Sequence, residues 1–288
     1  MYNVISIIER MVDMDKDIFD NQIFDTIDPP RKSTFKLAGS TLPNSQDIYF
    51  YSKWDELFER YQSARLFIRK CIEEAGNDWF NPVDDPTVQR GLELTFKAEL
   101  YETALINYNI LVDLSWTITY VSAEFTLYDF DNDGNITNST EISGMIPIEE
   151  AYNLLRKTEN KVKSPHAEGN PFQYLKVMAP EFSEAIDLII DFWKDFSNSD
   201  IRQMYNYVKH KGKPRYTEIE NLRGGKLFSI YVDNQEYPAD VRDIQKIVSL
   251  EQEIKKLLDF DNEKLFPYIQ TLLVSLKNAV NPSPYIIV

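Results

Sequence analysis

The sequence predicts an all-α fold, a helical bundle that carries one or two short inserted β-hairpins. Apolar residues recur at helical spacing in several long stretches, and the 288 residues include only nine glycines, well below the usual share of about 7%. Aromatic residues make up 13% of the chain, so a folded core has ample apolar surface to bury. These observations disfavour both a glycine-dense β-barrel and an unfolded chain.

Residues 1–48 are predicted to form an N-terminal arm that packs on the main domain. Apolar residues from Val4 to Met11 mark a short helix, and residues 25–49 are irregular because they contain several prolines and a glycine. Residues 49–288 are expected to form one helical domain, since neither a linker nor an internal repeat interrupts them.

Two strong helices are predicted next. An apolar stripe from Trp54 to Ile72 predicts the first helix and includes Cys71 as a small buried hydrophobe. Asp85-Pro86 opens the second, which extends into the 110s or beyond because proline is favoured in a first helical turn. Its most apolar part, residues 104–121, is too polar for a membrane span and predicts a buried central helix. Polar residues on this helix could face a cleft or a second subunit, but we favour neighbouring helix ends as their partners: Glu102, Asn109 and Asp113.

The C-terminal half alternates helices with turns. Period-two alternation in residues 217–219 and 228–232 predicts a β-hairpin with its turn at 221–225. Five further helices are predicted from apolar periodicity, at residues 148–157, 180–196, 200–211, 244–258 and 266–280.

Composition excludes several classes of function. The net charge of −15 argues against general affinity for nucleic acid or for an anionic membrane. One cysteine and two histidines are too few for a disulfide framework or a Cys- or His-rich metal site. The sequence contains no P-loop, dinucleotide fingerprint or nucleophile elbow, so we expect no cofactor. No basic leader precedes Glu9, so we expect a cytoplasmic protein without a membrane partner.

One acidic motif invites a calcium interpretation. Asp129, Asp131 and Asp133, followed by Gly134, match the first half of an EF-hand-type loop. Thr140 stands where a bidentate glutamate should close the site, and neither flank has a helical pattern. We therefore favour a β-hairpin or surface turn built on Asp133-Gly134, with calcium binding as the alternative.

The segment from Asn198 to Lys226 is unusually basic for this chain. Seven lysines and arginines stand against three acidic residues, a net charge of +4 within a chain of net charge −15. Such a patch can attract phosphate, although cations at the end of a solvated helix also complement its dipole. Four residues in this segment are the predicted phosphate contacts: Lys209, Lys211, Lys213 and Arg215.

A row of polar residues follows the same segment. Ser199 or Asp200 can cap a helix whose apolar stripe forms the core side. Arg202, Asn206 and His210 are spaced by four residues and form one slowly drifting row opposite that stripe. Arginine supplies a fixed charge for phosphate, and histidine can carry a proton near neutral pH.

The stretch from Arg202 to Gly212, with Asn206, Lys209 and His210 in its pattern, resembles the signature helix of the HEPN superfamily. These helical proteins occur in prokaryotic defence and toxin–antitoxin systems and in eukaryotes, and many are metal-independent endoribonucleases. Their motif is an arginine, usually a polar neighbour, and a histidine after four to six positions. Arg202, Gln203 and His210 correspond to this motif with seven intervening residues, one more than the usual range, and the Asn-x-x-Lys-His form recurs in diverged branches.

The resemblance implies a HEPN-like bundle that binds RNA and acts as an endoribonuclease of a defence or toxin–antitoxin system. In such chemistry the 2′-OH of the RNA attacks the adjacent phosphate. His210 would be the general acid or base, Arg202 would stabilise the phosphorane charge, and Asn206 would orient a reactant. Because the family's site forms where two signature helices meet, a homodimer is also implied. The alternative is a non-catalytic HEPN-like regulator or immunity protein, and a cognate regulator protein is a further expected partner.

Overall fold

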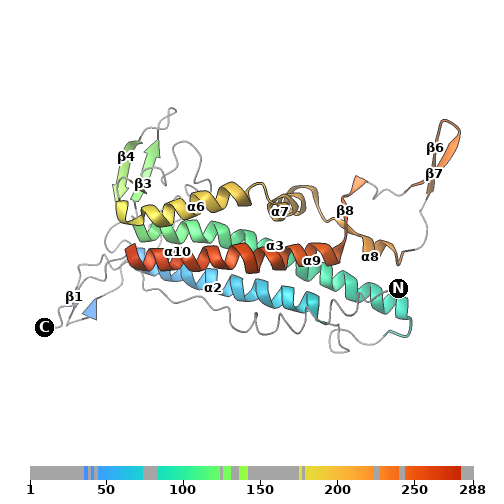
Figure 1. Ribbon diagram of the computed structural model, residues 1–288, viewed down its shortest axis with the longest axis horizontal. Helices are drawn as coiled ribbons and strands as arrows, with labels where there is room; N and C mark the ends of the chain where they lie inside the picture. The colour runs from blue at the N-terminus through green and yellow to red at the C-terminus, as the bar shows by residue number, and fades with distance from the viewer. Residues whose placement is uncertain are drawn as a thin grey trace. The chain divides into compact units, whose positions relative to one another are not determined.

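The computed structural model describes residues 36–37, 40–41, 45–73, 83–123, 126–130, 136–141, 175–176, 179–223, 228–239 and 244–279. Helices dominate these residues, and strands occur only in two-stranded pairs (Figure 1). The prediction of an all-α fold with short inserted hairpins is therefore confirmed. The helices expected at 4–11 and 148–157 lie outside the described residues. Among the described helices, none is long and apolar enough to cross a membrane.

The two long N-terminal helices are confirmed. α2 spans Ser45–Ile72 and so begins before the predicted stripe, whereas α3 spans Pro86–Ala123 and begins where expected. Asp85 fixes this start, because its Oδ1 accepts hydrogen bonds from the backbone N–H groups of Thr87 at 2.8 Å and Val88 at 3.3 Å. Pro86 lacks an N–H and leaves none unsatisfied.

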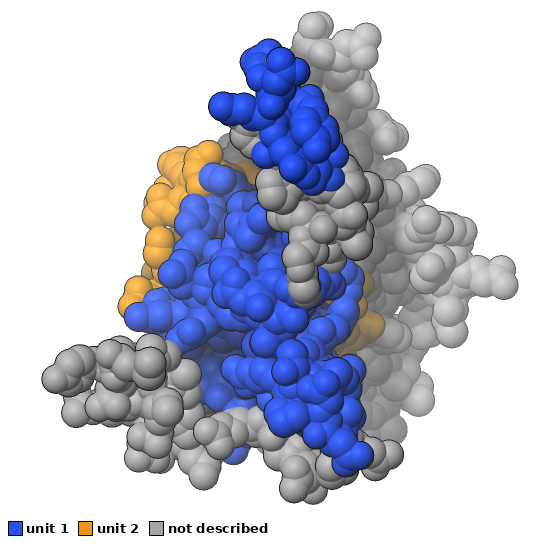
Figure 2. All heavy atoms as spheres, turned by 90° about the vertical axis from the view of Figure 1, so that its right-hand side faces the viewer, with its two compact units in different colours: residues 1–22, 63–107, 199–262 blue, residues 23–62, 108–198, 263–288 orange. Residues whose placement is uncertain are grey.

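The chain divides into two compact units, and each is assembled from three separate stretches of sequence (Figure 2). As a result, α2 and α3 each contribute one part to either unit. The stretches are residues 1–22, 63–107 and 199–262 in unit 1, and residues 23–62, 108–198 and 263–288 in unit 2.

Aromatic packing organises unit 2, in which α6 runs alongside α10 (Figure 1). Trp116 meets Trp193 edge-on with ring centroids 4.8 Å apart, and Phe192 stacks on Tyr268 at 3.8 Å. The buried Tyr268 hydroxyl shares a 2.9 Å hydrogen bond with Ser115, so its polar end is satisfied. The helix predicted at 180–196 is confirmed, with its first turn in 3₁₀ form. The elements of this part are η1 (Pro180–Phe182), α6 (Ser183–Phe196) and α10 (Phe266–Ala279).

Unit 2 also carries short strand pairs. β1 (Lys36–Leu37) pairs with β2 (Ser40–Thr41), and β3 (Thr126–Phe130) pairs antiparallel with β4 (Ile136–Glu141). The Asp129–Asp133 motif therefore begins within a strand of this hairpin, in agreement with the hairpin interpretation, and Asp129 lies in β3 opposite Asn138. Asp131 and Asp133 lie outside the described residues.

Unit 1 holds the basic segment. Its core is lined by the apolar sides of α2, α3, α7 and α9, and the π-helical segment η3 follows α9. β5 and β8 pair in parallel, whereas β6 and β7 form an antiparallel hairpin. The elements are α7 (Asp200–Lys211), β5 (Arg215–Tyr216), α8 (Thr217–Glu220), β6 (Phe228–Val232), β7 (Gln235–Ala239), β8 (Ile247–Val248) and α9 (Leu250–Phe260). Of η3 (Asp261–Leu265), only the first two residues belong to unit 1.

Two sequence predictions in unit 1 are wrong. Residues 217–219 do not pair with 228–232, because Thr217–Glu220 is helical and β6 pairs with β7. The turn of the actual hairpin is Asp233-Asn234, whose φ values of 50° and 62° suit a type I′ turn. The helix predicted from residue 244 starts instead at Leu250, since residues 247–248 form β8.

Candidate nucleic-acid interface

α7 forms where the sequence predicted it, and local signals explain both of its ends. Ser199 Oγ accepts the backbone N–H of Arg202 at 3.2 Å and so caps the first turn. Gly212 ends the helix with a φ of 98°, a left-handed value that favours glycine. The basic residues of its last turn therefore stand at a sharply defined C-terminus, where positive charge complements the helix dipole.

The predicted polar row lies on the side of α7 that faces away from the unit 1 core. Ile201 and Met204 are buried, at 4% and 1% exposure. Arg202 is half-buried, and Asn206 and His210 are exposed. Exposure increases along the row because a step of four residues drifts about 40° around the helix at 100° per residue.

Tyr205 sits between two cations on the same helix. The Arg202 guanidinium lies 5.0 Å from the ring centroid, and Lys209 Nζ lies 5.7 Å from it. Both distances are within the range of a cation–π attraction. The sequence analysis did not indicate this role of Tyr205. The signal was the spacing, with cations three residues before and four residues after an aromatic ring.

Arg202 and His210 are two separate contact points on one helix. Eight residues at 1.5 Å per residue place them about 12 Å apart along the axis. Arg202 is directed onto the Tyr205 ring, whereas His210 stands between Lys209 and Lys211 in the exposed last turn. The helix thus groups Arg202 with Lys209 on one side, whereas His210 and its two neighbouring lysines point in different directions around the exposed last turn.

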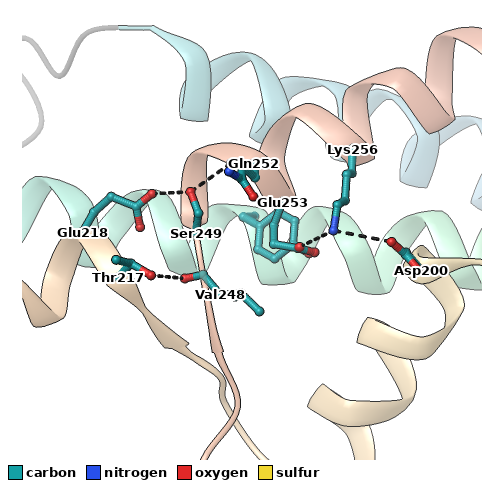
Figure 3. Close-up of polar contacts among 9 residues, drawn as sticks. Asp200, Thr217, Glu218, Val248, Ser249, Gln252, Glu253 and Lys256 are labelled. Atoms are coloured by element: carbon teal, nitrogen blue, oxygen red, sulfur yellow. Dashed lines mark hydrogen bonds and ion pairs between the residues drawn. The ribbon is translucent and has the colours of Figure 1, made fainter. Parts of the chain in front are cut away.

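The acidic residue of α7 is paired with a lysine from α9. Asp200 Oδ2 lies 3.5 Å from Lys256 Nζ, which also donates a 2.8 Å hydrogen bond to the buried Glu253 (Figure 3). The hydrogen bond to Glu253 raises the pKa of Lys256 above its ordinary value, so this lysine stays charged. Among the described residues, Lys209 and Lys211 form no ion pair, and they set the positive sign of the exposed last turn.

Lys213 and Arg215, the other predicted phosphate contacts, have acidic partners. Lys213 Nζ pairs with Glu99 and lies 3.8 Å from Glu102 Oε2. Arg215 is only 7% exposed and its guanidinium pairs with Glu220. The charge of Arg215 is therefore engaged inside unit 1, whereas the Lys213 side chain remains 57% exposed.

A buried anchor joins the segment after α7 to α3. The Tyr216 hydroxyl donates a 3.0 Å hydrogen bond to Glu102 Oε1, and both residues are buried. The Tyr216 ring also meets Tyr101 edge-on at 6.4 Å. Burial raises the pKa of Glu102 above its ordinary value, although Tyr216 and Lys213 oppose the rise. Glu102 therefore has a structural role, as we favoured for the polar residues of α3.

A second anchor ties the same segment to the start of α9. Glu218 accepts hydrogen bonds from Ser249 Oγ at 2.7 Å and from the backbone N–H groups of Leu250 and Glu251 at 2.9 and 3.2 Å. Thr217 Oγ1 donates to the Val248 carbonyl oxygen at 3.2 Å (Figure 3). The carboxylate thus satisfies N–H groups that a helix start leaves open. Sequence spacing did not indicate this contact.

Comparison of the chain with protein-family models, with curated proteins and with solved structures gives no match. The resemblance to HEPN proteins therefore remains a prediction from the signature helix alone. Among the described residues, no group of three or more His, Cys, Asp or Glu side chains could hold a metal ion.

Proposed function

We propose that the chain binds RNA through the outer side and the exposed last turn of α7, a surface formed by Arg202, Asn206, Lys209, His210 and Lys211 and called the α7 face below. The observation that carries the proposal is the local charge. Lys209 and Lys211 are exposed at the helix end, and cations so placed attract the phosphate backbone of RNA.

The charge of the rest of the chain restricts binding to this face. Asp200, the acid within α7, is paired with Lys256, so it does not cancel the exposed lysines. With a net charge of −15, the remaining surface repels a polyanion. Tyr205 supports the proposal because Arg202 and Lys209 both lie against its ring. The ring thereby holds two cationic side chains, both able to bind phosphate, on one side of the helix.

We extend the proposal to metal-independent cleavage of the bound RNA. His210 would accept the proton of the attacking 2′-OH or donate a proton to the leaving 5′-oxygen, and Arg202 would stabilise the charge on the phosphorane. Asn206, midway between them, would orient a reactant. The axial separation of about 12 Å favours an active pair made of Arg202 from one copy and His210 from a second, in a homodimer.

Cleavage is tested with an end-labelled single-stranded RNA in low salt and with EDTA, which removes contaminating metal nucleases. We expect cleavage by the wild type, loss of cleavage but retained binding with His210→Gln, and no cleavage of a fully 2′-deoxy strand. Arg202→Lys keeps the charge but loses the planar fork, so it should slow cleavage more than it weakens binding. Binding without any cleavage would leave the non-catalytic regulator as the function.

Association is tested by light scattering at micromolar concentration. A homodimer is expected, because closed two-fold dimers are the commonest soluble oligomers. Equal mixtures of the His210→Gln and Arg202→Lys chains should then regain part of the cleavage activity, since one mixed site keeps both native residues. A monomer with full cleavage activity would contradict the composite site while leaving RNA binding intact.

A further inference from the structure

Lys213 is an exposed cation that already forms an ion pair within the protein. It follows α7 by two residues and lies next to the α7 face in sequence. Its ammonium group pairs with Glu99 and lies 3.8 Å from Glu102 Oε2, two carboxylates of α3. The side chains of Lys213 and Glu99 are 57% and 54% exposed. The pair is therefore open to competitors from solution.

We propose that Glu99 and Glu102 bind the ammonium group of Lys213 in the free protein, and that RNA phosphate competes with these carboxylates for it. This inference rests on the proposed function of the α7 face. Lys213 is then an additional phosphate contact, which leaves the two carboxylates only when RNA is bound. Glu99 is an internal competitor that lowers the affinity for RNA.

The chemistry of the pair permits this exchange. Exposed ion pairs are weak and are screened by salt, so a phosphate with higher local charge can displace a single carboxylate. A lysine has a flexible four-carbon stem that can swing its ammonium group between partners. Arg215 offers a contrast, because it is buried against Glu220 and cannot change partner without opening unit 1. The raised pKa of Lys213, caused first by its hydrogen bond with Glu99, agrees with a carboxylate that holds this ammonium group.

Release of Lys213 leaves the surrounding segment in place. Tyr216 remains hydrogen-bonded to Glu102, Thr217 to the Val248 carbonyl group, and Glu218 to Ser249 (Figure 3). These contacts come from the residues directly after Lys213 and do not use its side chain. Only the lysine stem has to move, and α7 keeps its position within unit 1.

The test is a double-mutant cycle on binding of a labelled single-stranded oligouridylate, followed by fluorescence anisotropy over a range of KCl concentrations with EDTA present. The four proteins are the wild type, Glu99→Gln, Lys213→Gln and the double variant. Glu99→Gln alters an exposed side chain, so the fold is retained. It should tighten binding several-fold at low salt. Lys213→Gln should reduce the slope of log K against log salt by about 0.7, the value for one lost phosphate contact on a single strand. In the Lys213→Gln background Glu99→Gln should have little effect on the affinity.

Each other outcome has a definite meaning. An equal effect of Glu99→Gln in both backgrounds would reflect long-range charge alone, and it would overturn this inference while leaving RNA binding by the α7 face intact. Failure of all four proteins to bind would overturn the proposed function and this inference together. A second measurement compares acetylation of Lys213 with and without saturating oligouridylate, read by mass spectrometry. RNA should protect Lys213 as well as Lys211, and protection of Lys211 alone would contradict the inference.

Discussion

Replacing Tyr216 with phenylalanine tests the buried anchor that holds the segment after α7. The change removes one hydroxyl group and keeps the ring, including its edge-on contact with Tyr101. The lost bond is a 3.0 Å hydrogen bond to the carboxylate of Glu102, with the tyrosine 4% and the glutamate 6% exposed. Hydrogen bonds to charged groups contribute about 1.5–3 kcal/mol, and we expect Tyr216→Phe to lower the free energy of unfolding by about 2 kcal/mol.

The same anchor predicts a dependence on pH. Burial raises the pKa of Glu102 above the ordinary value of 4.5, so the folded chain binds this proton more tightly than the unfolded chain. The resulting stabilisation is complete below pH 4.5 and is lost as the pH rises through the raised pKa. Glu102→Gln removes the buried charge, so this variant should gain stability relative to the wild type at pH 7, and the gain should shrink as the pH falls.

Urea unfolding followed by circular dichroism measures both effects. The variants are compared with the wild type at several pH values under constant ionic strength. The reasoning is refuted if Tyr216→Phe changes the free energy of unfolding by less than about 0.5 kcal/mol. It is also refuted if the difference between Glu102→Gln and the wild type is the same at every pH.

Three further predictions concern other parts of the chain. Arg65 Nη1 and Asp261 Oδ2 form a buried ion pair at 2.5 Å. Asp261→Asn should therefore cost about 3–5 kcal/mol in urea unfolding, because a buried arginine loses its counter-charge, and a cost under about 1 kcal/mol would be inconsistent with it. Burial raises the pKa of the Cys71 thiol to about 12, so native protein at pH 8 should resist a thiol reagent that labels urea-unfolded chain, and fast native labelling would disprove this. Millimolar calcium should leave the melting temperature of the wild type and of Asp131→Ala unchanged, since a ligand stabilises only by binding the native state. A calcium-dependent rise that Asp131→Ala abolishes would instead establish a calcium site.

Local signals explain why α7 and α3 could be predicted from sequence. Ser199 caps α7, Gly212 stops it, and Asp85 caps α3, and each signal lies within a few residues of the helix end that it sets. The hairpin and the start of α9 failed for the opposite reason. Period-two alternation does not say which strand pairs with which, and Ile247–Val248 are drawn into β8 by Arg215–Tyr216, which are distant in sequence.

In the candidate site, too, features set by local sequence could be predicted and features set by distant residues could not. The exposed positions of Asn206 and His210 follow from helical periodicity, so the outward face of α7 could be predicted. The ion-pair partners of the charged residues in and after α7 could not be predicted. Lys213 pairs with Glu99, 114 positions away in the sequence, and Asp200 pairs with Lys256 of α9. Such ion pairs depend on how the helices of unit 1 pack together, which residue spacing within one helix does not encode.

The salt dependence of RNA binding tests the central claim, that the α7 face binds phosphate, most directly. The variant Lys209→Gln/Lys211→Gln is compared with Lys255→Gln/Lys264→Gln, which removes the same charge from two other exposed lysines. On a single-stranded oligouridylate, loss of two phosphate contacts should reduce the slope of log K against log salt by about 1.4 and weaken binding at low salt. The control pair should keep the wild-type slope. Equal slopes for the two variants, or no binding by the wild type at low salt, would contradict the claim.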